Sequence, residues 1–209
     1  MTDGRLARGE RTRNAVLDTA VTLATEVGLG GLSLGQLAET LGVSKSGLFA
    51  HWRSKEELQL ATIDRAREQW TERVVAPALR APRGVRRLWA LHEARLAFYR
   101  AAVLPGGCFF AKCQFEYNVQ PGAVRDRLAE ALGEWMALVE RLVTESIAVG
   151  ELRSDVDPRQ LAYEIEAFGM NAVVQSRLLA PEASYVHARR AALERLRSLC
   201  PDPTLLPEE

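Results

Sequence analysis

Apolar residues recur every three or four positions along most of the chain, and this helical period most constrains how the chain can fold. Glycine and proline are sparse and fall between the periodic stretches. No run of alternating apolar and polar residues is bounded by hairpin turn residues, so the pattern predicts essentially no β-sheet. We therefore expect an all-α fold of about nine helices.

The composition is that of a globular protein rather than a membrane or secreted one. The chain has 209 residues, 47% of them apolar, which is enough to bury a core in one large or two small domains. No apolar run approaches the roughly 20 residues that span a bilayer, and no apolar signal segment follows Met1. Three cysteines, an odd and low number, favour reduced thiols. We expect a cytoplasmic protein with no membrane partner.

The first two predicted helices carry clear end signals. Apolar spacing predicts a helix over residues 8–27, which Gly28–Gly31 ends because glycine readily takes positive φ. Ser33–Gln36 has the form of a capping box, in which a serine hydroxyl and a glutamine side chain bond free backbone N–H groups. It predicts a short helix, Leu34–Leu41, closed by Gly42.

The later helices follow the same signals. A short helix is expected over Ser44–His51, and a second capping box, Ser54–Glu57, begins a longer one that Pro77 ends. Asp157 followed by Pro158 is typical of a helix start. Five further helices are predicted: at about residues 85–103, 108–119 and 124–149, then from Pro158 toward Pro181, and after Pro181 a last one that carries Tyr185 to Leu199. We expect residues 201–209 to form a frayed tail.

The charge is balanced overall but is uneven along the chain. The net charge is zero, yet residues 1–55 hold seven Lys and Arg against five Asp and Glu, a charge of +2. Four of the arginines fall within nine residues, at positions 5, 8, 11 and 13. This cluster is a weak indication of nucleic-acid binding. A solvated arginine-rich terminus is the alternative interpretation.

Leu34–Leu41 and Ser44–His51, joined by Gly42-Val43, have the spacing of a helix-turn-helix. Such a unit places its second helix in the major groove of DNA, which is wide enough to admit one. The start of that helix, Ser44-Lys45-Ser46-Gly47, offers a cation, two hydroxyls and a residue without a side chain. The sequence therefore predicts DNA recognition by this helix.

The segment from Leu34 to Leu58, LGQLAETLGVSKSGLFAHWRSKEEL, resembles the N-terminal domain of TetR/AcrR-family transcriptional regulators. The resemblance covers about residues 8–60, whereas residues 61–200 match only in length and helical character. It implies a DNA-binding domain over residues 1–55 and an effector-binding and dimerisation domain over residues 56–200.

The resemblance also implies a set of DNA contacts. Phe49 stands where the family usually has a tyrosine, and phenylalanine cannot donate a hydrogen bond to phosphate. The Phe49 ring can therefore only pack against other side chains or contact the methyl group of a thymine. Lys55 begins a helix, where free N–H groups already favour phosphate. Leu37, Leu41, Val43, Leu48 and Trp52 are expected in the core. The predicted DNA-contacting residues are Arg5, Arg8, Arg11, Ser33, Ser44, Lys45, Ser46, Gly47, Phe49, His51 and Lys55.

The resemblance implies a pocket for a small-molecule effector in the second domain, and helical bundles with aromatic inner faces often hold apolar cavities. Ordinary core packing is the alternative for each candidate, and for His92 a hydrogen-bonded core histidine is favoured. The candidates are Trp89, His92, Tyr99, Phe109, Phe110, Cys113, Phe115, Tyr117, Trp135, Met136 and Phe168.

The last two helices are the expected homodimer surface, because small residues allow helices to approach closely. Twofold symmetry of the dimer then predicts a palindromic operator. The small residues concerned are Ala162, Gly169, Ala188, Ala191 and Ala192.

Together these features predict a ligand-responsive regulator, most simply a repressor released from its operator by an apolar or aromatic effector, without a cofactor or metal. Cys108 and Cys113 lack zinc-site spacing, and a thiol switch stays open for them. A helical enzyme or small-molecule binder without operator-specific binding is the alternative, but HExxH, paired ExxH and glycine-rich phosphate motifs are absent. A non-specific DNA coat is disfavoured by the near-neutral charge.

Overall fold

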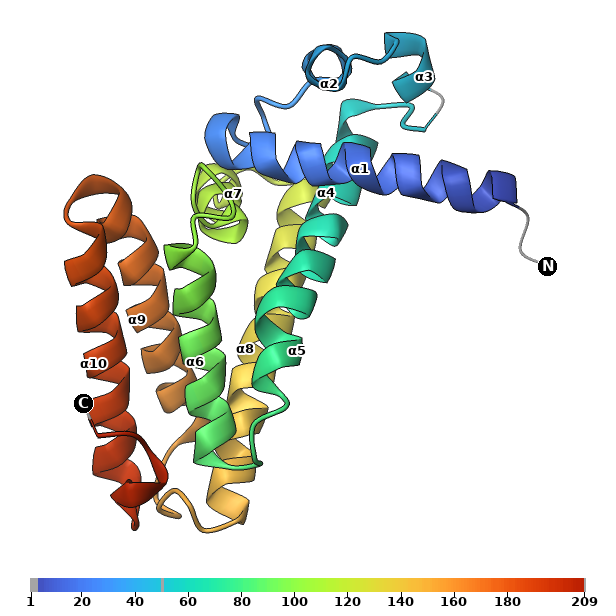
Figure 1. Ribbon diagram of the computed structural model, residues 1–209. Helices are drawn as coiled ribbons and strands as arrows, with labels where there is room; N and C mark the ends of the chain where they lie inside the picture. The colour runs from blue at the N-terminus through green and yellow to red at the C-terminus, as the bar shows by residue number, and fades with distance from the viewer. Residues whose placement is uncertain (1–3, 50, 209) are drawn as a thin grey trace. The chain divides into compact units, whose positions relative to one another are not determined.

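The computed structural model describes the backbone of residues 4–49 and 51–208, and the side chains of residues 13–48 and 51–208. Within these residues the chain is helical and has no β-strand, which confirms the all-α prediction. In chain order (Figure 1) the elements are α1 (Gly4–Val27), α2 (Leu34–Leu41), α3 (Lys45–Phe49), α4 (Lys55–Trp70), the π-helical turn η1 (Thr71–Val75), α5 (Ala76–Ala78), α6 (Val85–Arg100), α7 (Phe109–Tyr117), α8 (Ala123–Ala148), α9 (Pro158–Leu178), α10 (Pro181–Leu199) and the 3₁₀ turn η2 (Pro203–Leu205).

The chain divides into two compact units. The first comprises Met1–Gln69 and Leu104–Glu130, so α7 and the start of α8 belong with α1 to α4. The second comprises Trp70–Val103 and Ala131–Glu209, and holds α6, α9, α10 and most of α8. Each unit has its own buried apolar residues.

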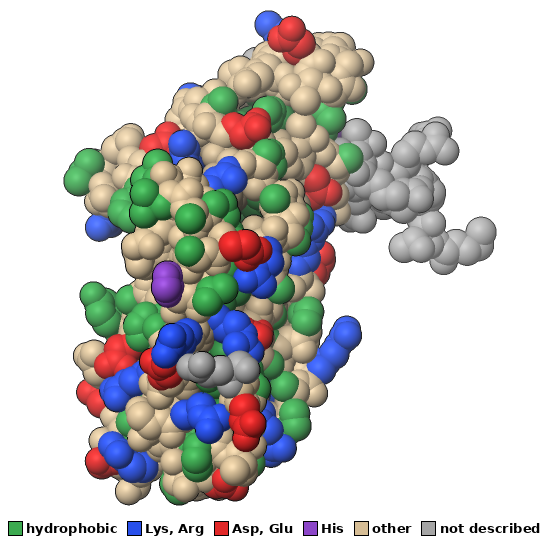
Figure 2. Space-filling model, turned by 60° about the vertical axis from the view of Figure 1, so that its left-hand side comes forward, with side chains coloured by type: hydrophobic (Ala, Val, Ile, Leu, Met, Phe, Trp, Pro, Cys, Tyr) green, Lys and Arg blue, Asp and Glu red, His purple; other side chains and the backbone are tan. Residues whose placement is uncertain are grey.

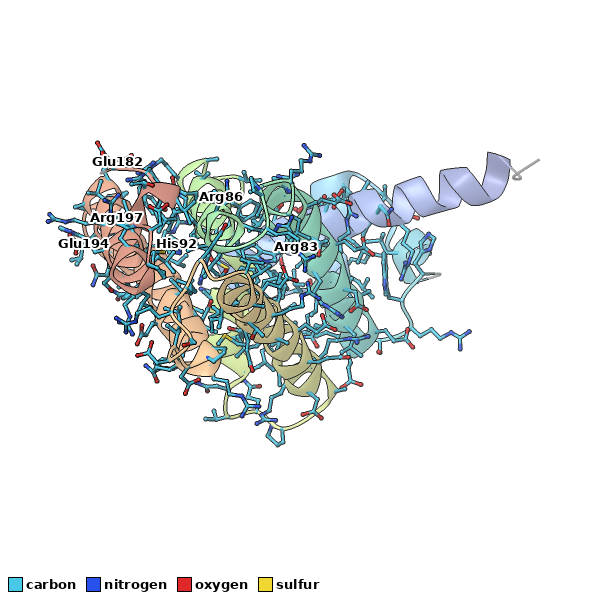
Figure 3. The ribbon with its side chains drawn as sticks, turned by 90° about the horizontal axis from the view of Figure 1, so that it is seen from below. Arg83, Arg86, His92, Glu182, Glu194 and Arg197 are labelled. Carbon is cyan, nitrogen blue, oxygen red and sulfur yellow. The ribbon has the colours of Figure 1, made fainter. Side chains whose placement is uncertain are left out.

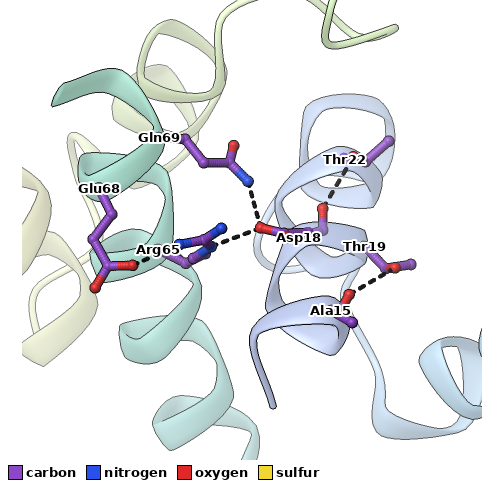
Figure 4. Close-up of polar contacts among 7 residues, drawn as sticks. All are labelled: Ala15, Asp18, Thr19, Thr22, Arg65, Glu68 and Gln69. Carbon is purple, nitrogen blue, oxygen red and sulfur yellow. Dashed lines mark hydrogen bonds and ion pairs between the residues drawn. The ribbon is translucent and has the colours of Figure 1, made fainter. Parts of the chain in front are cut away.

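In the first unit, α1 and α4 are joined by a polar contact. Asp18 Oδ1 accepts hydrogen bonds from Arg65 Nε at 2.6 Å and from Gln69 Nε2 at 2.7 Å (Figure 4). Arg65 also pairs with Glu68 at 2.8 Å, and these carboxylates raise the pKa of its guanidinium. Because the side chain of Asp18 is 45% exposed, solvent screens the pair, and its main effect is to set how α1 lies against α4.

The predicted helix ends are well reproduced where side chains cap them. Ser33 Oγ accepts from the Gln36 N–H at 3.1 Å, and Ser54 Oγ accepts from the Glu57 N–H at 3.0 Å. Asp157 caps α9 and Pro158 occupies its first turn. Each capping side chain bonds to a backbone N–H only two or three residues further along the chain, so these helix starts could be predicted without knowledge of the fold.

Pro77 does not end the helix that starts at Lys55, contrary to prediction. Helical backbone continues from α4 through η1 into α5. In the π-helical turn the Ala76 N–H bonds to the Thr71 carbonyl five residues back, instead of four. Pro77 then lies in α5, directly after the π-helical turn, where the helical backbone accommodates it.

In the second unit, α6, α9 and α10 run side by side (Figure 1). Their core includes the fully buried Leu88, Leu142, Leu161 and Leu196. Leu206, in the segment predicted to be a frayed tail, is only 3% exposed and packs into the same core. That prediction was wrong because an apolar side chain after η2 anchors the segment.

The small residues predicted at the dimer surface instead face the inside of one chain. Ala162, Gly169, Ala188 and Ala192 are buried, and Ala191 is half-buried. At Gly169 an added Cβ would stand 2.2 Å from Arg95 Cζ, so the missing side chain makes room for a buried guanidinium. Small residues here allow α9 and α10 to pack closely on their own neighbours, so these five residues do not form the dimer surface.

Gly169→Ala should destabilise the protein by about 2 kcal/mol, because the new methyl group must displace Arg95 from a filled site. Urea unfolding followed by circular dichroism measures the change. Gly133→Ala, in α8 with nothing within 4 Å of an added Cβ, is the matched control and should stabilise the protein by about 0.5–1 kcal/mol. Equal stabilisation by both substitutions would contradict the packing described for Gly169.

Candidate functional site

The predicted helix-turn-helix is present as α2 and α3 joined by a tight turn. Gly42 takes a left-handed backbone (φ 64°) and its N–H bonds back to the carbonyls of Ala38 and Glu39. Leu37, Leu48 and Trp52 are buried as predicted. Val43 is 44% exposed, so its prediction as a core residue was wrong: it lies in the turn, outside both helices.

The second helix of this unit, α3, is shorter than predicted: it spans Lys45–Phe49 rather than Ser44–His51. Ser44 precedes it, and its Oγ accepts from the Gly47 N–H at 3.2 Å and lies 3.2 Å from Ser46 Oγ. The side chains of Lys45 and Ser46 and the backbone of Gly47 are exposed. The start of α3 thus offers a cation, hydroxyls and open backbone to an incoming molecule.

Lys45 extends toward the beginning of α2. A Cβ built on Gly35 would lie 3.1 Å from Lys45 Cε, 3.3 Å from its Nζ and 3.9 Å from Ser33 Oγ. The ammonium group and the Ser33 hydroxyl therefore both lie beside Gly35, at the positive end of the α2 dipole. This arrangement suits a phosphate oxygen, and it brings together two of the predicted DNA-contacting residues.

Two further predicted residues lie after α3. His51 is exposed, and its ring centroid is 5.5 Å from that of Trp52. Lys55 begins α4 and donates a hydrogen bond from Nζ to the Gly30 carbonyl. An ammonium group has three protons, so Lys55 keeps two for a phosphate.

Arg13 was not among the predicted site residues, although it belongs to the N-terminal arginine cluster. Its guanidinium lies 5.9 Å from the centroid of the Trp52 ring, on the exposed side of the first unit. The side chains of Arg5, Arg8, Arg11 and Phe49 lie outside the described residues.

The predicted pocket residues are divided between the two units. Phe109, Phe110, Cys113, Phe115 and Tyr117 lie on α7 in the first unit. Phe115 is 64% exposed there. Trp89, His92, Tyr99, Trp135, Met136 and Phe168 lie in the second unit.

The thiols of α7 do not have the surroundings of reactive cysteines. Cys108 and Cys113 are both buried, and burial raises the pKa of the Cys113 thiol. A buried thiol with a raised pKa is rarely a thiolate, which is the reactive form. Nothing in this geometry favours a thiol switch.

His92 is 2% exposed, on α6 (Figure 3), and its Nε2 lies 3.3 Å from the Ala188 carbonyl oxygen. Burial, and then the nearby positive charge of Arg95, lower the pKa of His92 to about 3. The imidazole is therefore neutral at pH 7. The prediction of a hydrogen-bonded core histidine is confirmed.

An aromatic cluster in the second unit surrounds the end of α4. The Trp70 ring lies 5.5 Å from Phe98, 5.9 Å from Tyr99 and 5.4 Å from Trp135, measured between ring centroids. All four rings are only partly buried. Trp70 and Phe98 were missed in the sequence. Trp70 lies just before the π-helical turn, and the regular helical period does not extend through that turn.

A buried ion pair lies against this cluster. Arg95 is 2% exposed and its Nη1 is 2.8 Å from Glu166 Oε2, which also accepts from Trp135 Nε1 at 2.6 Å. The guanidinium lies 5.7 Å from the Tyr99 ring centroid and 5.5 Å from that of Trp135. The positive and negative charges are therefore already matched inside the protein.

The comparisons with known proteins agree with this geometry. The family model described as "Bacterial regulatory proteins, tetR family" matches residues 16–62, and the one described as "Tetracyclin repressor-like, C-terminal domain" matches residues 84–192. The chain belongs to the TetR family of transcriptional regulators. Members of this family bind operator DNA as dimers and respond to small-molecule effectors.

Three relatives of this TetR-family chain cover most of its length. The HTH-type transcriptional repressor ComR of Escherichia coli (strain K12) is 25% identical over 78% of this chain and 76% of ComR. A TetR transcriptional regulator from Chloroflexus aurantiacus J-10-FL has a TM-score of 0.85 and 27% identity, covering 93% of this chain and 98% of that chain. AibR, in complex with isovaleryl coenzyme A and operator DNA, has a TM-score of 0.65 and 20% identity, and the match covers 90% of this chain and 97% of the AibR chain.

The structure of this TetR-family regulator contains no described helix that is long and apolar enough to cross a membrane. Among the described residues, no three His, Cys, Asp or Glu side chains gather where they could hold a metal ion.

Lys45→Ala should weaken operator binding by about 1 kcal/mol, roughly fivefold, and lower the slope of log K against log salt by about one. Fluorescence anisotropy on a labelled operator duplex at several salt concentrations measures both quantities. Lys112→Ala removes an exposed lysine from α7 and serves as the control, with an unchanged slope expected. Identical slopes for the two variants would exclude Lys45 as a phosphate contact.

Proposed function

We propose that the chain is a repressor that binds a palindromic operator through α3 and is released by a small, neutral, aromatic or apolar effector. The observation that supports the DNA-binding part of this proposal is the exposed start of α3, where Lys45, Ser46 and Gly47 do not pack in the core. The observation that carries the effector half is the partly buried aromatic cluster at Trp70.

The operator contacts follow from the geometry of the first unit. The serine hydroxyls at the start of α3 meet base edges in the major groove, where they find hydrogen-bond partners. Lys45 with Ser33, and Lys55 at the start of α4, meet phosphates on either side. His51, Arg13 and the N-terminal arginines add backbone contacts. Phosphate contacts supply affinity and hold the register in which α3 reads bases.

The effector class follows from the charges in the second unit. Trp70, Phe98, Tyr99 and Trp135 offer ring faces, which bind flat apolar molecules. The guanidinium of Arg95, which lies beside these rings, is already paired with Glu166. An anionic effector would have to separate this buried pair, which is costly. A neutral molecule meets only the rings, so we expect the site to prefer it.

Release needs no chemical step, and we propose that the protein acts by binding rather than turnover. An effector that binds one arrangement of the dimer more tightly than the arrangement that fits the operator shifts the protein away from DNA. The fall in operator affinity cannot exceed the difference between the effector's affinities for the two arrangements, and each tenfold fall needs a difference of about 1.4 kcal/mol. AibR, which holds isovaleryl coenzyme A and operator DNA, supports the use of this fold for both ligands. Because the operator lies on the chromosome, the proposed site of action is the cytoplasm.

The functional division proposed for the chain is DNA binding by residues 1–55 and effector binding and dimerisation by residues 56–200. The dimer surface proposed is the exposed face of α9. Its side chains recur at three- and four-residue spacing along one side of the helix. These are the exposed Tyr163, Ala167, Val174 and Leu178, with the half-buried Met170 among them. Figure 2 turns forward the side of Figure 1 on which α9 and α10 lie, and hydrophobic side chains are interspersed there with charged ones.

Val174→Glu should raise the dimer dissociation constant at least tenfold, because it buries a charge in an apolar interface. Sedimentation velocity measures the dimer, and anisotropy on the operator duplex should show a parallel loss of binding. Val119→Glu makes the same change at an exposed apolar residue (83%) of the first unit and should leave the dimer intact. A dimeric Val174→Glu protein would exclude this face.

Neutral indole and 2-naphthol should release the protein from its operator at lower concentrations than the anions benzoate and 2-naphthoate. Trp70→Ala should weaken binding of a releasing compound at least tenfold, since it removes a ring that contacts three others. Isothermal titration calorimetry measures that affinity directly.

Phe115→Ala, which alters a predicted pocket residue that is 64% exposed on α7, is the control for Trp70→Ala and should bind the compound normally. A preference for the anions would contradict the neutral-effector proposal, and equal loss in the two variants would move the site away from the aromatic cluster.

A further inference from the structure

The loop between α1 and α2 is held by a single carboxylate from far along the chain. The Leu29 N–H donates to Glu116 Oε2 at 2.9 Å and the Gly30 N–H donates to Glu116 Oε1 at 2.8 Å. Both oxygens of Glu116 are therefore bound to consecutive backbone amides. Hydrogen bonds to an ionised carboxylate are the stronger kind, and two together fix orientation as well as distance.

Gly28 lets the carboxylate approach this closely. An added Cβ there would stand 2.4 Å from Glu116 Oε2, and the residue has a left-handed backbone at φ 78°. Both constraints require glycine at this position. The end of α1 and the place of Glu116 are thus determined together.

The carbonyl groups of the same loop are bound from α4. Gln59 Nε2 donates to the Leu29 carbonyl at 2.8 Å and to Tyr117 Oη at 2.9 Å, so it joins the loop to α7 a second time. Lys55 Nζ donates to the Gly30 carbonyl. Side chains therefore bind both the N–H and the C=O groups of Leu29 and Gly30.

We propose that Glu116 is a positioning residue for operator binding. Its carboxylate holds the α1–α2 loop, and the loop in turn sets the start of α2 and the place of Lys55, which is proposed to bind phosphate. The inference rests on the proposed DNA-binding function of the first unit. Glu116 lies outside residues 16–62, the part of the chain that matches the DNA-binding family model.

Removing the charge of Glu116 has opposite expected effects on operator affinity under the two explanations, positioning of the loop and charge repulsion. Whether binding weakens or strengthens therefore decides between them. A carboxylate in the DNA-binding unit repels phosphates, so removing its charge should strengthen binding if charge alone matters. Glu116→Gln keeps the size of the side chain but has one acceptor oxygen and places an NH₂ group against a backbone N–H. If Glu116 positions the loop, binding should weaken.

The experiment compares full-length native protein, Glu116→Gln and Glu26→Gln on the operator duplex by fluorescence anisotropy. Glu26 is an exposed carboxylate near the end of α1, so its change is matched in charge. We expect Glu116→Gln to bind about tenfold more weakly, and Glu26→Gln to bind as tightly as native protein or more tightly. The salt slope of Glu116→Gln should fall by about one, as for Lys55→Ala, because the Lys55 phosphate contact is lost.

Adding Lys55→Ala to Glu116→Gln should lower the slope no further, a non-additivity that a general loss of stability would not produce. Native-like or tighter binding by Glu116→Gln overturns the proposal, and so does an unchanged slope. If Glu116→Gln is unfolded at the assay temperature, Glu116→Asp keeps the charge but withdraws the oxygens, and native-like binding by it overturns the proposal equally. Native protein that prefers no duplex sequence would instead refute the proposed function.

Discussion

The DNA-binding surface depends on the left-handed backbone of Gly42. At φ 64° this residue ends α2 and lets the chain turn within three residues into α3. Leu37 and Leu48, on either side of the turn, are buried beneath it, and Trp52 completes the core. A residue with a Cβ would strain this turn, because the left-handed region disfavours side chains. With the turn in place, the apolar faces point inward and Lys45 and Ser46 point outward.

The elements that could be predicted from the sequence are those set by local chemistry. Ser33, Ser54 and Asp157 cap helices through hydrogen bonds to amides two or three residues away, and such contacts need no knowledge of the fold. Leu37 could be assigned to the core from apolar spacing, and Trp52 from its place in the segment that resembles the TetR family. The DNA-contacting surface could also be predicted from the sequence, because α2 and α3 are adjacent along the chain.

What the sequence did not reveal depends on contacts between distant residues. Gly169 is small because Arg95, 74 positions earlier, occupies the space beside it, and spacing along α9 alone suggested a partner helix instead. The passage of the helix through Pro77 depends on the π-helical turn, which also puts Trp70 among rings from α6 and α8. Glu116 binds amides 86 and 87 residues away, a relation that no local pattern carries.

Selection from a random pool of duplexes tests the central claim, that the dimer reads DNA sequence through α3, most directly. The full-length protein is incubated with the pool and the bound fraction is sequenced over successive rounds. The account predicts enrichment of an inverted repeat whose half-sites are about 10 base pairs or a multiple of that apart. A bound fraction with no enriched sequence would contradict it.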